Sequence, residues 1–355
     1  MSIRIVALHT LRALGIFALA QWLTRKRLRI LCYHGFSIGD EYEVAPFMFM
    51  RAATFRRRME VLRRRDIDVV SLDEGVNLLR RGLVRKAETV ITLDDGWESN
   101  LTIGTPILKE FGFPACVYVT TEHLGSNAEV FNVILNYMIH RSEVDVLELR
   151  GIHPNVDGNY AIRTNYFPAM LSLIAAVEKS FLFEERISVL RLIARALKLN
   201  FDEVIEGRRF RLLTRAEMIE LHGCGVDIQL HTHTHRLPPD AESTAREITL
   251  NRESIREVLG QQKDHFCYPS GMYTPDHVRW LEGLGVRSAT TCDTGLNPAG
   301  THPLLLRRFL DREDFDDIQF EAEICGLNDL GRELRGKLLA FMPRSNTQPA
   351  GSEAR

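Results

Sequence analysis

Short runs of β-branched and aromatic residues alternate with amphipathic helical patterns along most of this 355-residue chain. The strand-like runs lie at 28–36, 68–72, 88–95, 115–121, 226–232, 264–271, 286–293 and 303–310. Helical patterns stand between them, at 54–65, 72–82, 105–112, 213–225, 245–260 and 275–285. Such alternation is typical of βαβ units around a parallel sheet. Seven or eight units predict an α/β fold of the distorted TIM-like (β/α)7–8 barrel type.

The alternation is interrupted between residues 126 and 213. This stretch contains apolar helical patterns such as NVILNYMIH and FPAMLSLIAAV, and no clear strand. We therefore expect a helical insertion, or lid, between the fourth and fifth barrel strands, inside a domain that spans 28–340. The polar tail at 341–355 has few apolar residues and is expected to be disordered.

Residues 1–27 admit three interpretations. The run IVALHTLRALGIFALAQWL has a basic start and an Ala-x-Ala, which suit a secretory signal. His9 and Arg12 interrupt the apolar run, and a spanning helix needs about 20 mainly apolar residues. A helix on a membrane surface, with RKRLR at 25–29 against anionic headgroups, is the second interpretation, and an ordinary capping helix the third. LRILCYH follows the basic cluster directly and leaves almost no linker for a cleaved signal. We therefore expect a cytoplasmic protein peripheral to the inner membrane, with secretion or the periplasm as the alternative.

Composition excludes some classes of protein. Hydrophobic residues make up 45% and charged residues 26%, as in an ordinary soluble globular protein. The net charge of −2 gives no reason to expect a nucleic-acid partner. The six cysteines form no CxxC pair, so neither a thiolate zinc site nor a disulfide framework is predicted.

Polar clusters follow four of the predicted strands. They are Tyr33-His34-Gly35, Asp94-Asp95-Gly96, His231 to His235 and Tyr268-Pro269-Ser270-Gly271. In a parallel barrel, catalytic residues come from the carboxyl ends of several strands. Two imidazoles and a carboxylate can hold a Lewis-acid metal with open positions, and a second carboxylate can act as general base. The residues alone do not select which histidines would bind.

Four of these motifs resemble those of the polysaccharide deacetylases (carbohydrate esterase family 4, NodB homology). TLDDG at 92–96 is similar to the family's TFDDG, and HTHTH at 231–235 to its His-Ser/Thr-x-x-His, while YHGF and YPSG resemble segments of some members. The resemblance spans about 29–310. It implies that Asp95, His231 and His235 bind the metal, and that His233 is not required. Zn2+ is the implied ion, with Co2+ or Ni2+ sometimes accepted.

The same resemblance implies catalytic roles. Asp94 would be the general base and His34 the general acid, with His302 in reserve. A backbone N–H near Ser270 would hold the oxyanion.

Two further points are open at this stage. Where many relatives have an Arg that orients the Asp, this chain has Cys267, and Arg307 or Arg308 is a candidate substitute. Trp97, Tyr268 and Tyr273 are candidates for stacking on a sugar, or else packing residues.

The expected function is removal of acetyl groups from an N- or O-acetylated glycan or a lipid-linked sugar precursor of the cell envelope. Two alternatives remain: an amidohydrolase acting on a small non-carbohydrate amide, and a non-catalytic glycan-binding relative. A groove lined by aromatic rings would favour a sugar, and a closed pocket under the 126–213 insertion would favour a small amide. Asp94 argues against the non-catalytic alternative, because binding alone needs no general base.

Overall fold

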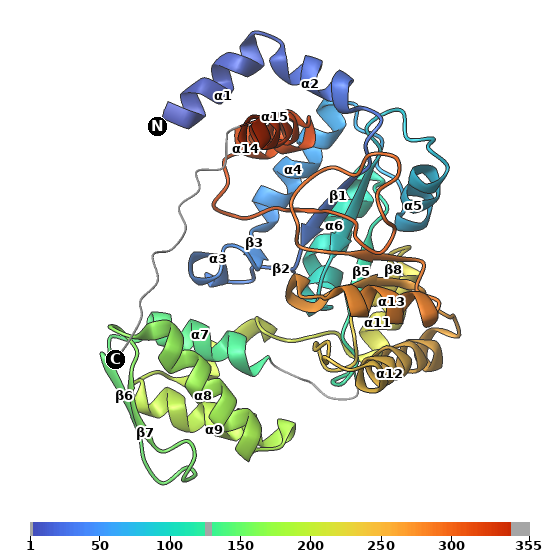
Figure 1. Cartoon of the computed structure of the whole chain (residues 1–355). Coiled ribbons are helices and arrows are strands. Elements are labelled where there is room, and N and C mark those ends of the chain that lie inside the picture. The colour runs from blue at the N-terminus through green and yellow to red at the C-terminus, as the bar shows by residue number, and fades with distance from the viewer. Residues whose placement is uncertain (1–2, 125–129, 342–355) are drawn as a thin grey trace, which may run out of the picture.

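The computed structural model describes residues 3–124 and 130–341 (Figure 1). Seven parallel strands form one sheet, in the spatial order β10-β9-β8-β5-β4-β1-β11. They are β1 (Arg29–Tyr33), β4 (Thr89–Leu93), β5 (Cys116–Val119), β8 (Asp227–Leu230), β9 (His265–Cys267), β10 (Ser288–Thr290) and β11 (Phe309–Leu310).

The two edges of the sheet meet through the segment that leads into β11. Leu306 forms a bridge with Thr290 of β10, and Phe309 pairs with Leu31 of β1. The sheet therefore curls into the distorted TIM-like barrel that the alternation predicts.

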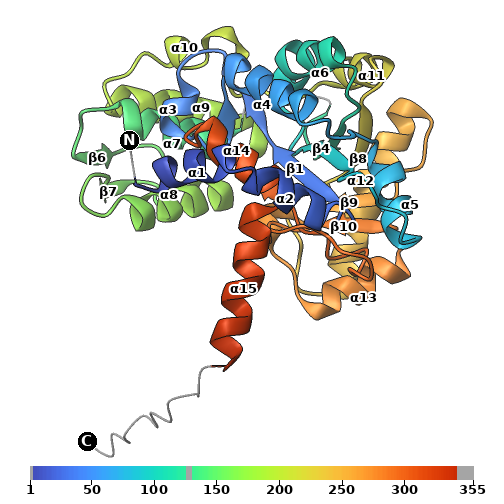
Figure 2. The same cartoon turned by 90° about the horizontal axis from the view of Figure 1, so that it is seen from above.

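Helices cover the outside of this sheet, as Figures 1 and 2 show. The predicted ones are confirmed as α4 (Ala52–Arg64), α5 (Leu72–Arg80), α6 (Thr105–Phe111), α11 (Arg215–Gly223), α12 (Ala241–Leu259) and α13 (Pro275–Gly283). Smaller elements are β2 (Gly35–Phe36), α3 (Glu41–Val44), β3 (Phe49–Met50) and the helical turns η1 (Asn100–Gly104) and η3 (Pro269–Gly271).

The strand predicted at 68–72 is wrong. Only Val69 pairs, in a single bridge to Thr89. Ser71 is already the N-cap of α5, with its hydroxyl accepting a bond from the amide of Glu74. The capping signal thus starts a helix inside the short β-branched run.

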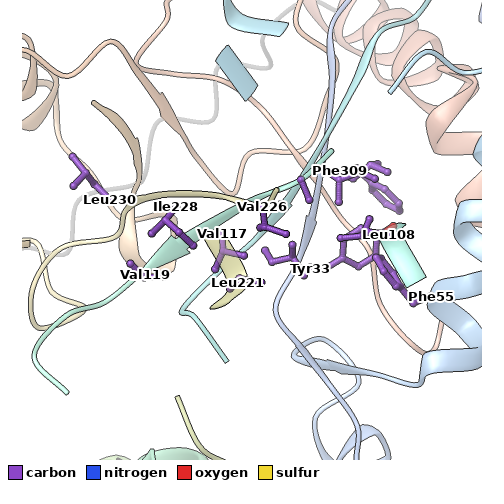
Figure 3. Close-up of a cluster of buried hydrophobic side chains, with 14 of the residues drawn as sticks. Tyr33, Phe55, Leu108, Val117, Val119, Leu221, Val226, Ile228, Leu230 and Phe309 are labelled. Carbon is purple, nitrogen blue, oxygen red and sulfur yellow. The ribbon is translucent and has the colours of Figure 1, made fainter. Parts of the chain in front are cut away.

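The core between sheet and helices is built from side chains of both layers. Figure 3 shows strand residues such as Val117 and Ile228 beside Phe55 of α4, Leu108 of α6 and Leu221 of α11. These side chains are almost fully buried, which fixes the helices against the strands and so holds the strand ends in place.

The insertion is mainly helical, as predicted. It contains α7 (Phe131–Arg141), α8 (Tyr166–Ser180), α9 (Phe183–Ala196), α10 (Phe201–Val204) and the turn η2 (Glu206–Arg208). It also contains an antiparallel hairpin, β6 (Val146–Leu149) with β7 (Gly158–Ala161), so the expectation of no strand is wrong. The strand β6 alternates exposed and buried residues, which is the two-residue period of a half-buried strand.

A further helical layer lies beside the barrel. It comprises α1 (Ile3–Ala13), α2 (Ile16–Thr24), α14 (Asp317–Ile324) and α15 (Leu327–Phe341). Buried side chains such as Leu8 and Phe17 join α1 and α2 to Ile318 and Ala322 of α14. Apart from Phe341, the tail expected to be disordered lies outside the described residues.

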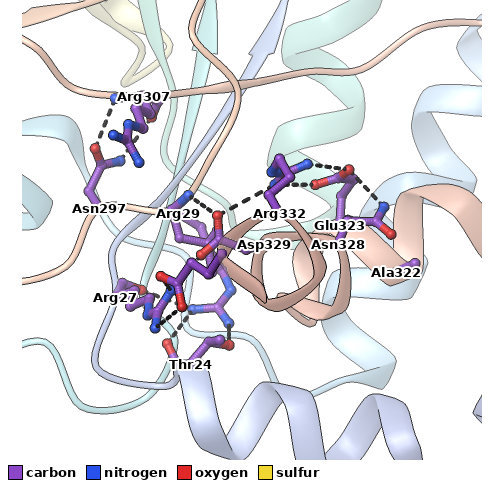
Figure 4. A network of polar contacts seen from close by, with 12 residues as sticks. Thr24, Arg27, Arg29, Asn297, Arg307, Ala322, Glu323, Asn328, Asp329 and Arg332 are labelled. Atoms are coloured by element: carbon purple, nitrogen blue, oxygen red, sulfur yellow. Dashed lines mark hydrogen bonds and ion pairs between the residues drawn. The ribbon is translucent and has the colours of Figure 1, made fainter. Parts of the chain in front are cut away.

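Within the described chain, no single helix has the length and apolarity to cross a membrane. Helices α1 and α2 reach that length and apolarity only when taken together, and they are bent by 78° at their break. The basic cluster at 25–29 is also divided. Arg29 is buried and donates to the carbonyl of Ile324 and the hydroxyl of Thr24, while Arg27 pairs with Asp329 (Figure 4). The expectation that the whole cluster faces headgroups is therefore wrong.

Candidate active site and metal centre

The four polar clusters lie at the carboxyl ends of barrel strands. His34 follows β1, Asp94 and Asp95 follow β4, the histidine segment follows β8, and Tyr268 follows β9. Because parallel strands all end on the same side of the barrel, segments far apart in the sequence meet there.

Asp95, His231 and His235 come together as a compact set of groups that could hold a metal ion. One carboxylate oxygen of Asp95, Oδ1, lies 3.3 Å from Nε2 of His231 and 3.3 Å from Nε2 of His235. Ligands about 2.0–2.2 Å from a metal at tetrahedral or octahedral angles are themselves about 3.0–3.5 Å apart. The spacing therefore fits a shared divalent cation such as Zn2+.

The backbone explains which histidines take part. Strand β8 ends at Leu230, and Thr232 and His235 have positive φ of 62° and 58°, so the histidine segment is a turn. Strict strand alternation does not apply there. His233 points elsewhere, with its Nδ1 2.9 Å from the hydroxyl of Thr121.

Buried polar groups hold His231 in one orientation. Its Nδ1 lies 2.8 Å from the carbonyl of Cys267, and since a carbonyl only accepts, Nδ1 carries the proton and Nε2 is left as the ligand atom. Its backbone N–H donates to Asn251 of α12, whose amide in turn donates to the Val119 carbonyl and the Thr121 hydroxyl. Asn251 was not predicted. The sequence signal for Asn251 is that an amide side chain stands on the buried face of α12, between Ile248 and Ile255.

Asp95 is held from its other side. The indole N–H of Trp97 donates to Asp95 Oδ2 at 3.0 Å. Burial alone would raise the pKa of Asp95, but hydrogen bonds from His231 and His235 outweigh it and hold that pKa well below 3.8. The carboxylate stays charged at neutral pH.

Asp94 lies beside this set but has a different partner. Nη1 of Arg308 donates to Asp94 Oδ1 at 2.7 Å, and Nη2 donates to Oδ2 at 2.8 Å. Both side chains are buried. Burial would raise the pKa of Asp94, but the charge and hydrogen bonds of Arg308 lower it to about 2.

Of the two candidate substitutes for the Arg absent from the strand-six motif, Arg308 is the one that reaches Asp94, and its Nη2 also lies 3.1 Å from Cys267 Sγ. The other candidate, Arg307, is exposed.

The remaining predicted residues differ in how they lie. His34 is half-buried, and one of its ring nitrogens lies within 4.8 Å of a carboxylate oxygen of Asp94. Ser270 is exposed with φ of 54°, in the turn after β9. The reserve acid, His302, pairs with Glu282 at 3.3 Å.

Two of the three predicted stacking rings, Trp97 and Tyr268, are buried, and the third, Tyr273, is half-buried. Trp97 is 2% exposed and packs edge-on against Phe49. Tyr268 is fully buried and stacks on Tyr273. The structure therefore gives Trp97 a holding role toward Asp95 and gives Tyr268 a packing role.

A cavity of about 470 Å3 joins the metal-binding groups to the insertion. Asp95, His235 and Arg236 line it from the barrel, and Phe183 and Arg186 of α9 from the insertion. Arg236, the residue after His235, pairs with Glu178 of α8 at 2.5 Å and so links the two walls of the cavity. The volume lies within the range of about 300–1,000 Å3 typical of small-ligand pockets.

Comparisons with known proteins agree with this fold. The family model described as polysaccharide deacetylase matches residues 198–289. The Streptococcus pyogenes deacetylase PplD, solved in complex with acetate, superposes with a TM-score of 0.55 at 16% identity, covering 84% of this chain and 98% of that one. IcaB from Ammonifex degensii superposes with a TM-score of 0.55 at 17% identity, covering 84% of this chain and 97% of that one.

BC0361, a polysaccharide deacetylase from Bacillus cereus, gives a TM-score of 0.51 at 15% identity, covering 84% of this chain and 69% of that one. A search of curated proteins gave no significant match. At these identities the superpositions establish the shared fold.

Proposed function

We propose that this chain belongs to the polysaccharide deacetylase family, whose model matches residues 198–289, and that it is a metal-dependent hydrolase that removes acetyl groups from an N- or O-acetylated glycan. One observation carries the proposal. A buried aspartate held by an arginine, Asp94, adjoins a carboxylate and two imidazoles whose spacing fits a metal. Binding alone would require no buried, unligated carboxylate at that place.

The ligands would be Asp95, His231 and His235. A divalent ion such as Zn2+, bound there, would supply Lewis acidity toward the acetyl carbonyl and the hydrolytic water.

Asp94 is suited to take the proton of that water. Arg308 occupies one direction at each carboxylate oxygen, and the thiols of Cys32 and Cys267 also donate to Oδ2, which leaves Oδ1 to accept a further bond. Arg308 also keeps the base ionised and fixed in orientation, so no rotation is needed before the reaction. His34 lies close enough to Asp94 for both to serve one scissile bond, and it would give a proton to the leaving group.

The size and lining of the cavity support a glycan substrate. Residues of the insertion line one wall of the cavity beside Asp95 and His235, and its volume of about 470 Å3 would hold a sugar residue with its acetyl group. Helices α8 and α9 lie where they would select neighbouring groups. A lipid-linked sugar precursor is the finer version of this substrate. The lining of the same cavity favours a second candidate, hydrolysis of a small non-carbohydrate amide, because it holds few exposed aromatic rings.

Acetate release from N-acetylglucosamine oligomers of increasing length tests this function. The purified protein would be assayed after chelation, after addition of Zn2+, Co2+ or Ni2+, and as Asp94→Asn, with the exposed Asp145→Asn as matched control. Metal-dependent release that Asp94→Asn loses and Asp145→Asn keeps is expected. Release from small amides alone would favour the second candidate. Metal and glycan binding without release from any substrate would contradict hydrolysis.

A further inference from the structure

Helices α1 and α2 and the break between them carry exposed apolar side chains. Trp22 is 57% exposed, Leu14 70% and Ile3 90%, and about half of each of Val6, Leu19 and Leu23 is exposed. The inner faces are also apolar, since Leu8 and Phe17 are buried against α14. Apolar patches of this kind on a soluble protein mark interaction sites.

The pair cannot straighten without loss of contacts. The bend lies at Gly15, whose φ is 77°. On its two sides, Arg12 pairs with Glu321 at 3.1 Å, and Thr24 donates to the Cys325 carbonyl at 3.3 Å. A straight helix would break at least one of these contacts and expose apolar surface that is now buried. These contacts hold α1 and α2 in their bent arrangement.

A cationic rim adjoins the exposed apolar side chains at the end of α2. Arg25, Arg64, Arg85 and Lys86 line a shallow hollow beside Trp22, and Asp66 is the one acidic residue of its lining. The guanidinium of Arg25 lies 4.4 Å from the centre of the Trp22 ring. The rim comes from three separate segments, which the basic cluster at 25–29 could not indicate.

We propose that this face, defined by Leu19, Trp22 and Leu23 together with the cationic rim, is a docking surface for a bilayer containing anionic phospholipids. The rim meets lipid phosphates while the apolar side chains enter the headgroup boundary. Trp22, with a cation on its ring and apolar neighbours, has the amphipathic character that suits this boundary. The contact is peripheral, because the bend is fixed by α14.

The surface also sets the orientation of the active site. The helix α2 leads into the amino end of β1, whereas His34 follows its carboxyl end. Figure 1 accordingly shows α1 and α2 at the opposite end of the molecule from α7, α8 and α9. On a membrane, the cavity faces away from the bilayer. This orientation rests on the proposed function and bears on its substrate. It favours an extended glycan over the lipid-linked precursor named above, whose sugar would lie close to the membrane plane.

Vesicle flotation of the full chain tests the surface. Vesicles of phosphatidylcholine alone would be compared with vesicles that also contain phosphatidylglycerol, at low and raised salt. Two double variants remove the surface, Leu19→Glu with Leu23→Glu, and Arg85→Glu with Lys86→Glu. Matched controls on exposed positions of the insertion are Phe167→Glu with Leu171→Glu, and Lys179→Glu with Lys198→Glu.

The expected result is flotation with the anionic vesicles, weakened by salt and by each surface variant at least tenfold, and unchanged in the controls. Equal flotation of surface and control variants would overturn the proposal, as would retention after an alkaline carbonate wash. Dimerisation through the same residues without flotation would assign the face to a second copy and also overturn it.

Activity keeps this proposal distinct from the proposed function. The surface variants should release acetate from soluble oligomers at the wild-type rate, and so should vesicle-bound protein. Loss of that rate on binding would overturn the orientation. Flotation without acetate release by any form would leave the surface established and refute the deacetylase.

Discussion

Two adjacent aspartates, Asp94 and Asp95, have different surroundings and different proposed roles. Asp95 adopts a left-handed φ of 72°, and Gly96 follows with 83°. This turn directs the Asp95 carboxylate toward two imidazoles and leaves Asp94 facing Arg308 inside the barrel. A non-glycine residue held with positive φ is locally strained, and such strain commonly occurs at functional sites.

Exchanging each aspartate for asparagine should separate their roles. Asp94→Asn is expected to bind metal as the wild type does and to lose about 10²–10⁴-fold in kcat, the contribution of a general base. Asp95→Asn should lose metal affinity, because an amide oxygen replaces a charged ligand. Metal titration by calorimetry and acetate release would be measured for both. If the two variants showed the same defect, the division of roles would be wrong.

Arg308→Met should affect both stability and pH dependence. Breaking a buried ion pair costs about 3–5 kcal/mol of unfolding free energy. Without the guanidinium, burial raises the pKa of Asp94 from its value of about 2, so the acidic limb of the rate profile should move to higher pH. Urea unfolding and a pH–rate profile would be compared with Arg307→Met, the exposed neighbour. Equal effects of the two substitutions would contradict the positioning role.

At the scale of elements, helix α12 supports the metal-binding turn after β8. Asn251 fixes the backbone of His231, and Glu247 accepts bonds from the amide and hydroxyl of Thr234. One helix thus secures both ends of the turn that carries His231 and His235.

Asn251→Leu should loosen this turn. It leaves the amide of His231 and the carbonyl of Val119 without a buried partner, at about 1–3 kcal/mol for an unsatisfied group. Groups that orient a ligand typically contribute about 10–100-fold to metal affinity, and a fall of that size is expected. Zinc affinity from competition with a chelating dye would be compared with Asn77→Leu, on the outer helix α5. An unchanged affinity would show that the turn is fixed without Asn251.

The strands and helices of the barrel were predictable from local signals in the sequence. The closure of the barrel and the contacts between residues across the site were not. Alternating patterns indicated seven of the strands and the capping boxes of α5 and α11. The sequence could not distinguish Arg308 from Arg307 as the partner of Asp94, because Asp94 lies 214 residues from Arg308 and no local pattern selects one arginine. The turn at Thr232 was missed because its positive φ depends on α12 rather than on a glycine.

Closure of the barrel gives the molecule a pH dependence. Asp311, directly after β11, pairs with Arg58 of α4 at 2.9 Å, and both side chains are fully buried. Burial outweighs the charge of Arg58 and raises the pKa of Asp311 from 3.8 to about 6. Since the folded state holds this proton more tightly than the unfolded chain, the stabilisation is complete below about pH 4 and is lost as pH rises through about 6.

Asp311→Asn should remove that dependence while keeping a hydrogen bond to Arg58, which also donates to the Phe315 carbonyl. A shift of this size corresponds to about 3 kcal/mol, so the unfolding free energy of the wild type relative to the variant should fall by about that amount between about pH 4 and about pH 7. Urea unfolding at intervals across this range would measure it. Asp317→Asn, at a half-exposed partner of the same arginine, is the control and should follow the wild type. A wild-type profile parallel to that of Asp311→Asn would mean that Arg58 keeps Asp311 ionised throughout, and that barrel closure is independent of pH.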